Sequence, residues 1–342
     1  MSTSTTTADQ AVTDPLPPDS VPYVLESGQG RAYLLLGEVG RTLAGGEQTN
    51  GQMSVLTCTG PSAPRPIPLH FHEAEHDLFY CVRGRMQVWC DGVSRVLGPG
   101  DFASVPPGAV HAYQLLDHSS MFMGPIVPAG WDTFFAFTGT PYDGPMYPPV
   151  DPSPPPFEKF AAAESKYHMT YVHDQPYAEA TTGPDDALPG AEEPYFLRAG
   201  EGPRHAAFGQ VAFQILTGAQ TRDRLGMAVV EGPKGSVVPA HRHERTPEAI
   251  YVLDGLVRAR VAGEEHLLAR GDFLNVPAGT VHELTFERPL TRYATMNAPA
   301  GIERLHELCG RAAEHRIYSP VPEPADPAGL ERAAAELDVV FA

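Results

Sequence analysis

Short apolar segments, separated by glycine and proline, run along most of this chain of 342 residues. Residues 78–82 (LFYCV) and 86–90 (MQVWC) are typical of two strands joined by a turn at Gly84. Residues 249–253 (AIYVL) have the character of the first of these strands and are followed by a turn at Gly255. Many short strands at this spacing predict an all-β barrel or sandwich.

Several regions depart from the strand pattern. Residues 146–157 are crowded with proline, 157–167 form a candidate helix, and 178–190 are expected to be a loop. Near the end of the chain, residues 301–313 and 328–337 are predicted to be amphipathic helices. We expect such helices to pack on the outside of a barrel or on a neighbouring subunit.

The strand-rich part of the chain is an internal repeat. Pro22 corresponds to Pro194 at a difference of 172 in residue number, and Gly84 corresponds to Gly255 at a difference of 171. The second copy is therefore one residue shorter, and the loss falls between Pro233 and its first histidine. The copies extend over about 22–126 and 194–297.

The repeat and the proline content together predict five parts of the chain. They are a disordered tail at 1–21, an N-terminal barrel at 22–145, a proline-rich linker at 146–193, a C-terminal barrel at 194–300 and a helical extension at 301–342. The tail is polar and lacks the apolar run of a secretory signal, and no stretch approaches the length of a membrane span. We therefore expect a cytoplasmic protein.

Charge and cysteine content narrow the class of partner. Lys plus Arg total 24 and Asp plus Glu total 42, which gives a net charge of −18. This acidic balance argues against nucleic acid and anionic membranes as partners. The 42% apolar content is typical of a globular protein, and four cysteines without CxxC spacing are expected to be buried free thiols.

Histidines and one acid recur at matching positions of the two copies. The first set is His70, His72, Asp77 and His111, and the second is His241, His243, Glu248 and His282. All four pairs differ by 171 in residue number. Residues two apart in a strand point the same way, so both histidines of each His-x-His project to one side. The last histidine follows a Pro-x-Gly turn and is expected on the opposite wall, while a turn could return the acid to the same interior.

This donor set predicts one metal ion in each barrel and no organic cofactor. Three imidazoles and a carboxylate, without a thiolate, suit Fe, Mn, Co, Ni, Cu or Zn better than Ca or Mg. A metal that takes about five or six ligands would keep positions open for substrate or dioxygen. A lone His-x-His is usually a surface strand, but here the whole spacing is duplicated. One barrel could still have lost its metal and kept its histidines.

The spacing resembles a known family. His70-x-His72-(x4)-Asp77-(x6)-Gly84 with Gly100-(x5)-Pro106-x-Gly108-(x2)-His111 is similar to the two cupin motifs, and the second copy matches them fully. The chain thus resembles a bicupin, with two tandem cupin barrels of the double-stranded β-helix (jelly-roll) type. Residues 44–49 (AGGEQT), 79–81 (FYC) and 100–102 (GDF) resemble the quercetin 2,3-dioxygenase group.

The resemblance implies a metal-dependent dioxygenase that opens the ring of a flavonol or related polyphenol. In that family the enol hydroxyl is deprotonated, dioxygen adds across the ring and carbon monoxide leaves. The motif carboxylate is both metal ligand and base, and the matching residues here are Asp77 and Glu248. The implied partners are a small aromatic substrate and dioxygen, without nucleic acid or membrane, and bicupins are often dimers, which favours a homodimer.

Asp77 departs from the family pattern, which has Glu at this position. Its carboxylate reaches roughly 1 to 1.5 Å less far, a large difference against metal–ligand tolerances of about 0.2 Å. The backbone could move in to restore the bond, or the carboxylate could hold a bound water. Alternatively, the base could be set for another acidic substrate, or the change could have no consequence.

The predicted cavities of the two barrels differ. Strand alternation places Phe79 and Cys81 in the first cavity, with Tyr113 two residues after its last histidine. The counterparts in the second are aliphatic: Ile250, Val252 and Leu284. An aromatic cavity suits a flat polyphenol, so Phe79 and Tyr113 are candidate substrate-binding residues and the first barrel is favoured as catalytic. Both could equally be ordinary core residues.

Other functions remain open at this point. An oxalate decarboxylase would need a small cationic pocket, whereas the predicted cavity positions are apolar. Gentisate dioxygenases resemble the histidines of the second motif but lack the acid supplied by Glu248. An enol-processing enzyme of secondary metabolism is a further alternative. A non-catalytic bicupin typically loses its ligands, and this chain keeps both sets.

Overall fold

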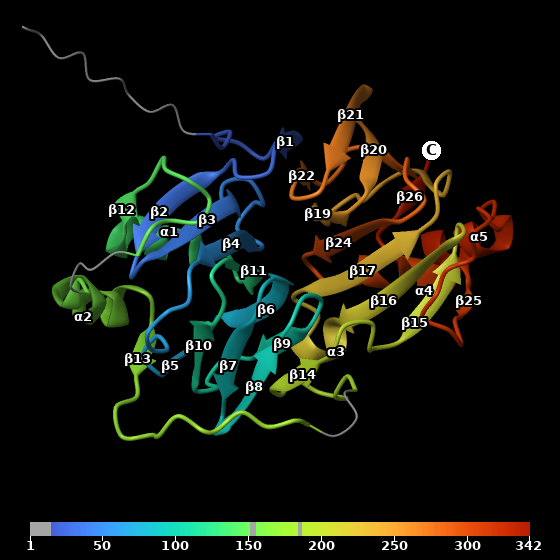
Figure 1. The fold of residues 1–342 in the computed structure, drawn as a ribbon. Coiled ribbons are helices and arrows are strands. Elements are labelled where there is room, and N and C mark those ends of the chain that lie inside the picture. The colour runs from blue at the N-terminus through green and yellow to red at the C-terminus, as the bar shows by residue number, and fades with distance from the viewer. Residues whose placement is uncertain (1–14, 151–154, 184–186) are drawn as a thin grey trace, which may run out of the picture.

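The computed structural model describes residues 15–150, 155–183 and 187–342. Two barrels lie side by side, the first coloured blue to teal and the second yellow to red (Figure 1). Each is built from an eight-stranded and a five-stranded sheet whose strands pair antiparallel. The expected all-β architecture of two tandem barrels is confirmed. Most of the predicted tail, residues 1–14, lies outside the described residues, while Leu16 is buried in a core.

The N-terminal barrel is formed by two sheets. In order, the larger contains β12 (Thr140–Pro141), β2 (Arg31–Leu35), β3 (Glu38–Ala44), β4 (Ser54–Gly60), β11 (Ser120–Val127), β6 (His76–Arg83), β9 (Phe102–Val105) and β14 (Tyr195–Leu197). The smaller contains β13 (Met169–Tyr171), β5 (His70–His72), β10 (His111–Leu115), β7 (Met86–Cys90) and β8 (Val93–Leu97). The two strands predicted at 78–82 and 86–90 are confirmed.

The C-terminal barrel repeats this plan. Its larger sheet contains β1 (Tyr23–Leu25), β22 (Phe273–Val276), β19 (Glu248–Asp254), β24 (Thr291–Asn297), β17 (Gly226–Gly232), β16 (Gln210–Leu216), β15 (Arg204–Ala207) and β25 (Arg311–Ala312). The smaller contains β21 (Glu264–Ala269), β20 (Leu256–Val261), β23 (His282–Phe286), β18 (Val237–Arg242) and β26 (Val340–Phe341). The helices are α1 (Asp132–Thr138), α2 (Phe157–Lys166), α3 (Gly218–Thr221), the 3-10 turn η1 (Ile302–Arg304), α4 (Leu305–Cys309) and α5 (Pro327–Glu336).

The first strand of each copy belongs to the sheet of the other barrel. Strand β1 pairs with β22, with Leu25 opposite Phe273, and β14 pairs with β9, with Leu197 opposite Phe102. A large apolar core lies between the barrels, separate from the core inside each barrel, and draws buried residues from both copies. The exchange of strands and this shared core join the two barrels into one body, because neither larger sheet is complete within its own copy.

The duplication also includes the segments that follow the barrels. Helices α2 and α5 occupy matching positions, 170 residues apart. Strand β13 pairs with the His-x-His strand of the first barrel, placing Tyr171 opposite His70, and β26 does the same in the second, placing Phe341 opposite His241. The proline-rich linker is thus the counterpart of the helical extension, and each supplies an edge strand beside the histidines.

Two of the three predicted helices are confirmed, at 157–166 and 327–336. The prediction of one helix over 301–313 is wrong beyond Cys309. Gly310 passes directly against β15, where a Cβ atom would lie 1.9 Å from the Ala206 carbonyl oxygen. The chain therefore leaves the helix there and pairs with β15 as β25. Among the helices that the structure describes, none combines the length and the hydrophobicity that a membrane span requires.

Candidate metal centres

The first histidine set converges inside the N-terminal barrel. His70 and His72 lie on β5 and face the interior together, and His111 lies directly opposite His70 on the neighbouring strand β10. The expectation that His111 starts on the opposite wall is wrong, because β10 and β5 belong to the same sheet. The opposite wall contributes Asp77, near the start of β6 in the larger sheet.

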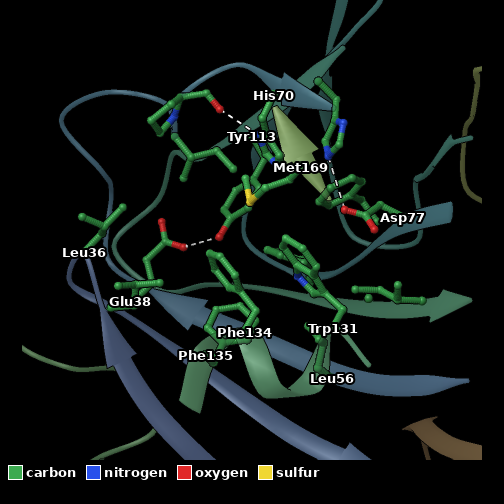
Figure 2. A pocket seen from close by; sticks show the side chains of 18 of the residues that line it. Leu36, Glu38, Leu56, His70, Asp77, Tyr113, Trp131, Phe134, Phe135 and Met169 are labelled. Carbon is green, nitrogen blue, oxygen red and sulfur yellow. Dashed lines mark hydrogen bonds and ion pairs between the residues drawn. The ribbon is translucent and has the colours of Figure 1, made fainter. Parts of the chain in front are cut away.

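The three imidazoles form a compact buried group. One nitrogen from each of His70, His72 and His111 lies within 4.8 Å of the others. The Asp77 Oδ2 atom is 3.3 Å from the Nε2 atoms of both His72 and His111, outside hydrogen-bond geometry. Figure 2 shows Asp77 and His70 among the residues that surround the adjoining cavity. Asp77 is nevertheless not part of the mutually close group, which places its carboxylate to one side of the three histidines.

Backbone carbonyl groups orient two of these rings. The Nδ1 atom of His70 is 2.8 Å from the Pro68 carbonyl oxygen, and that of His111 is 3.0 Å from the Ala109 carbonyl oxygen. Donation from Nδ1 leaves Nε2 as an unprotonated donor atom for a metal. Burial, followed by the nearby imidazoles of His111 and His72, holds the pKa of His70 well below its usual range. His70 is therefore neutral, the form in which histidine binds a metal.

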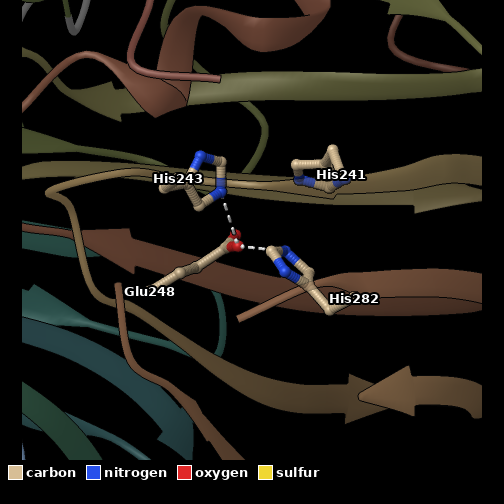
Figure 3. A group of neighbouring side chains, drawn as sticks. All are labelled: His241, His243, Glu248 and His282. Carbon is tan, nitrogen blue, oxygen red and sulfur yellow. Dashed lines mark hydrogen bonds and ion pairs between the residues drawn. The ribbon is translucent and has the colours of Figure 1, made fainter. Parts of the chain in front are cut away.

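The second set is held more completely. Donor atoms of His241, His243, Glu248 and His282 all lie within 4.8 Å of one another. The Glu248 carboxylate lies between two of the rings, with Oε2 3.3 Å from His243 Nε2 and 3.0 Å from His282 Nε2 (Figure 3). Its other oxygen accepts a hydrogen bond from the Thr295 hydroxyl.

All three rings of the second set have carbonyl partners at Nδ1. His241 is 2.7 Å from the Pro239 oxygen, and His282 is 3.0 Å from the Thr280 oxygen. The Nδ1 atom of His243 is 3.0 Å from the carbonyl oxygen of Asp338, which follows α5. In the first set, His72 Nδ1 has no such partner among the described residues, and its ring packs edge-on against Trp131 at 4.1 Å between centroids.

Both donor sets fit a first-row transition metal ion. In the N-terminal barrel, buried atoms of His72, His111 and Asp77 have no hydrogen-bond partner in the part of the chain that the structure describes. Buried polar atoms without partners are costly, and a cation between them would satisfy them together. Burial alone would raise the pKa of Asp77, but the His72 and His111 rings outweigh it and leave the pKa below its usual range. Asp77 is therefore an anionic donor.

The residue facing the carboxylate also differs between the barrels. Thr295, which hydrogen-bonds to Glu248, corresponds to Gly124 at a difference of 171 in residue number. Gly124 lines the N-terminal cavity and offers no hydroxyl to Asp77. The second barrel thus combines a longer carboxylate with a hydroxyl partner that fixes its orientation, and the first combines a shorter carboxylate with a residue that has no side chain at the partner's position.

A cavity of about 90 Å³ adjoins the first histidine set. The candidate residues Phe79 and Tyr113 line it, whereas Cys81 packs into the barrel core instead. Six further residues that were not predicted from the sequence complete the wall. Three aromatic residues come from the start of α1 and three residues come from the linker: Trp131, Phe134, Phe135, Phe160, Met169 and Tyr171. The dense aromatic run at 131–137 (WDTFFAF) was a signal that could have identified part of this wall.

The corresponding cavity of the C-terminal barrel is only about 20 Å³. Leu284 lines it as expected, but Ile250 and Val252 are buried in the barrel core. Residues Ile302 and Leu305 line this space at the positions of Trp131 and Phe134. The start of the helical extension therefore lines this cavity as the start of α1 lines the first.

Comparison with known proteins relates this geometry to named relatives. Residues 61–123 and 228–291 each match the family described as cupin domain. A quercetin 2,3-dioxygenase of Bacillus subtilis is 28% identical over 312 residues, which cover 91% of this chain and 92% of the relative. A quercetin 2,3-dioxygenase of Aspergillus japonicus is 27% identical over 49% of this chain and 57% of its own length. The S161A mutant of Bacillus subtilis oxalate decarboxylase shares the fold, with a TM-score of 0.54 and 16% identity over 85% of this chain and 80% of that one.

Proposed function

Because this chain is a bicupin with a buried metal-ligand set in each of its two barrels, we propose that it is a metal-dependent flavonol dioxygenase. The substrate is a flavonol or a related polyphenol with an acidic enol hydroxyl. Dioxygen is incorporated, the ring opens and carbon monoxide is released. The reaction takes place in the N-terminal barrel.

One observation carries this proposal: an aromatic cavity opens beside the histidines of the N-terminal barrel. Its walls include Phe79, Trp131 and Phe134, which offer flat apolar surfaces to a planar ring system. The C-terminal barrel keeps its four potential ligands but has a cavity less than a quarter as large. The relatives named quercetin 2,3-dioxygenase support the same substrate class.

The four residues of the N-terminal ligand set have roles in this reaction. His70, His72 and His111, with Asp77, would hold the metal ion, which when bound supplies Lewis acidity toward the enol oxygen and dioxygen. Asp77 accepts the enol proton through its carboxylate, whose Oδ1 atom has no hydrogen bond within the described ranges. The aromatic walls orient the ring and exclude water from the reacting carbons.

The oxalate decarboxylase alternative fits the fold but not the cavities. No lysine or arginine is among the described residues that line either cavity, so neither offers a cation to a small dianion. The low-identity similarity to oxalate decarboxylases extends to the fold alone. The chemistry of the walls therefore favours a large apolar substrate.

Oxygen consumption with a panel of flavonols tests the proposal. The metal-replete protein should consume dioxygen and release carbon monoxide in equal amounts when given 3-hydroxyflavone or its hydroxylated derivatives. Oxalate serves as a parallel substrate. Formation of formate from oxalate, without oxygen uptake on any flavonol, would exclude the dioxygenase and establish the alternative.

A further inference from the structure

A second buried carboxyl group lines the N-terminal cavity, away from the histidines. Glu38 stands at the start of β3, just after the turn that joins β2 to β3, and only 6% of it is exposed. Figure 2 shows Glu38 and Asp77 on opposite sides of the cavity. The cavity thus has two polar ends, and the proposed reaction uses only one of them.

One oxygen of Glu38 receives both of its hydrogen bonds. The Tyr113 hydroxyl donates to Oε2 at 2.9 Å, and the Cys58 thiol donates to the same atom at 3.1 Å. The Oε1 atom has no hydrogen-bond partner among the described residues. Burial raises the pKa of Glu38 to about 7, although these two bonds act against the rise. Once this carboxyl group is ionised, the Oε1 atom is an acceptor without a donor among the described residues.

The fold itself does not require this polar cluster. In the C-terminal barrel, Gln210, Val230 and Leu284 occupy the positions of Glu38, Cys58 and Tyr113. Gln210 there is paired with His306, at 2.9 Å between Oε1 and Nε2. A barrel of the same architecture thus closes with an amide and two aliphatic side chains. At this position the carboxyl group, with an acceptor atom that no described residue uses, occurs beside the larger cavity and is replaced by a paired amide beside the smaller one, which indicates a ligand contact.

Aromatic side chains separate the two polar ends. The Phe79 ring lies between them, with its centroid 5.8 Å from that of Tyr113 and 6.2 Å from that of His111. Because His111 and Tyr113 are two residues apart on β10, their side chains lie along the same wall. A ligand that reaches from the histidines to Glu38 must therefore be flat and apolar in its middle and polar at both ends.

From this arrangement we infer that Glu38 is a specificity-determining residue that accepts a hydrogen bond from a phenolic hydroxyl at the end of the substrate remote from the metal centre. The inference rests on the proposed function for the identity of the aromatic core and adds the ring substitution that the cavity selects. Unsubstituted 3-hydroxyflavone would contact the apolar walls but would leave the Oε1 atom of Glu38 without a hydrogen-bond donor.

Binding measurements on the metal-loaded, full-length protein without dioxygen test the inference. The ligands are 3-hydroxyflavone, derivatives with a hydroxyl group on either outer ring, and the matching methyl ethers, which lack the donor. The measurements are made at pH 8, above the pKa of Glu38, because a hydrogen bond to the charged carboxylate is stronger than one to the neutral acid. The wild type should therefore bind the best hydroxylated ligand at least about tenfold more tightly than its methyl ether.

The variant Glu38→Gln should reduce this preference to less than about twofold, because an amide that still accepts from Tyr113 turns its NH₂ group toward the ligand. Its affinity for 3-hydroxyflavone should stay close to that of the wild type, which also reports correct folding. Glu303→Gln is the matched control, since Glu303 is a buried acid beside the C-terminal cavity. It should preserve the full preference.

Equal binding of hydroxylated ligands and methyl ethers by the wild type would overturn the inference without requiring any variant. So would an equal loss of affinity for all ligands in Glu38→Gln. Selective binding without oxygen uptake would support the recognition site and overturn the dioxygenase. Absence of any flavone binding would overturn both.

Discussion

The two barrels keep the same ligand positions but differ in the space beside them. In the C-terminal barrel, four donor residues lie within mutual reach, and a cavity of about 20 Å³ remains. In the N-terminal barrel, three histidines form the compact group, Asp77 lies to one side, and the cavity is about 90 Å³. The more complete metal centre is thus in the barrel with less room for a substrate.

The residues that line the two cavities also differ at matching positions of the shared fold. Trp131 and Phe134 on the α1 side are replaced by Ile302 and Leu305, which reach into the second cavity from η1 and α4. At the other end, Glu38 is replaced by Gln210, whose amide is already paired with His306. The presence of all the potential metal-ligating residues therefore does not by itself identify the barrel that binds the substrate. The volume of the cavity beside those residues has to be considered as well.

The largest effect is expected from removing one metal ligand from each barrel separately. His72→Ala should lower flavonol turnover at least about a thousandfold, because the metal supplies several kcal/mol of charge stabilisation in such reactions. His243→Ala should change turnover by less than about threefold. Steady-state oxygen uptake, with the metal content of each variant measured in parallel, checks both values.

The reverse pattern would move the chemistry to the C-terminal barrel and break the comparison. Equal activity of both variants and wild type would exclude both sites. Metal analysis gives an independent check, since each variant should retain about one equivalent of metal and the wild type about two, if each barrel binds one ion.

The histidines could be predicted from the sequence because their arrangement depends on local geometry. His70 and His72 are two apart on one strand, so any strand at this position points them the same way. The place of His111 could not be predicted reliably, since it depends on which strands pair, and strand pairing is a long-range property. The prediction of the opposite wall was wrong for this reason.

The cavity was harder to predict because distant segments build it. Phe79 and Tyr113 follow from strand alternation, but Met169 and Tyr171 come from the linker, whose strand β13 pairs with β5. The exchange of β1 and β14 between the barrels could not be predicted from the local sequence either. Each has the sequence of an ordinary first strand, and only its pairing places it in the sheet of the other barrel. Glu38 appears in the sequence as a single acid at the start of a strand, and only its buried contacts make it distinctive.

The next largest effect concerns the pH dependence of stability. The folded state raises the pKa of Glu38 to about 7, so it favours the protonated carboxyl group more than the unfolded state does. The stabilisation is fully present below the unfolded pKa of about 4.5 and is lost as pH rises through about 7. Glu38→Gln gives the N-terminal cavity the residue of its counterpart and removes this loss.

Between pH 5.5 and pH 8, the free energy of unfolding of Glu38→Gln relative to wild type should rise by about 2 kcal/mol. Denaturant unfolding of the metal-loaded proteins at the two pH values measures this change. Glu26→Gln removes the same charge from an exposed position and should show no such change. A constant difference between Glu38→Gln and wild type at both pH values would contradict the raised pKa.

The smallest effect tests why the C-terminal centre is held more completely. The Thr295 hydroxyl donates to Glu248, and the matching Gly124 offers nothing to Asp77. Thr295→Val removes the hydroxyl at nearly constant volume and should weaken metal binding in the C-terminal barrel about tenfold, the lower end of the effect of partners that orient ligands. Competition for Co²⁺ between a chelator and the protein, in a His72→Ala background, reports this barrel alone.

Thr291→Val is the control, because Thr291 lies on the same strand and hydrogen-bonds to backbone carbonyl groups instead of Glu248. If Thr295→Val retains full affinity, carboxylate length and not its orientation distinguishes the two centres; if it loses affinity while Thr291→Val does not, the missing hydroxyl at Gly124 leaves Asp77 freer to release the metal and to accept a proton.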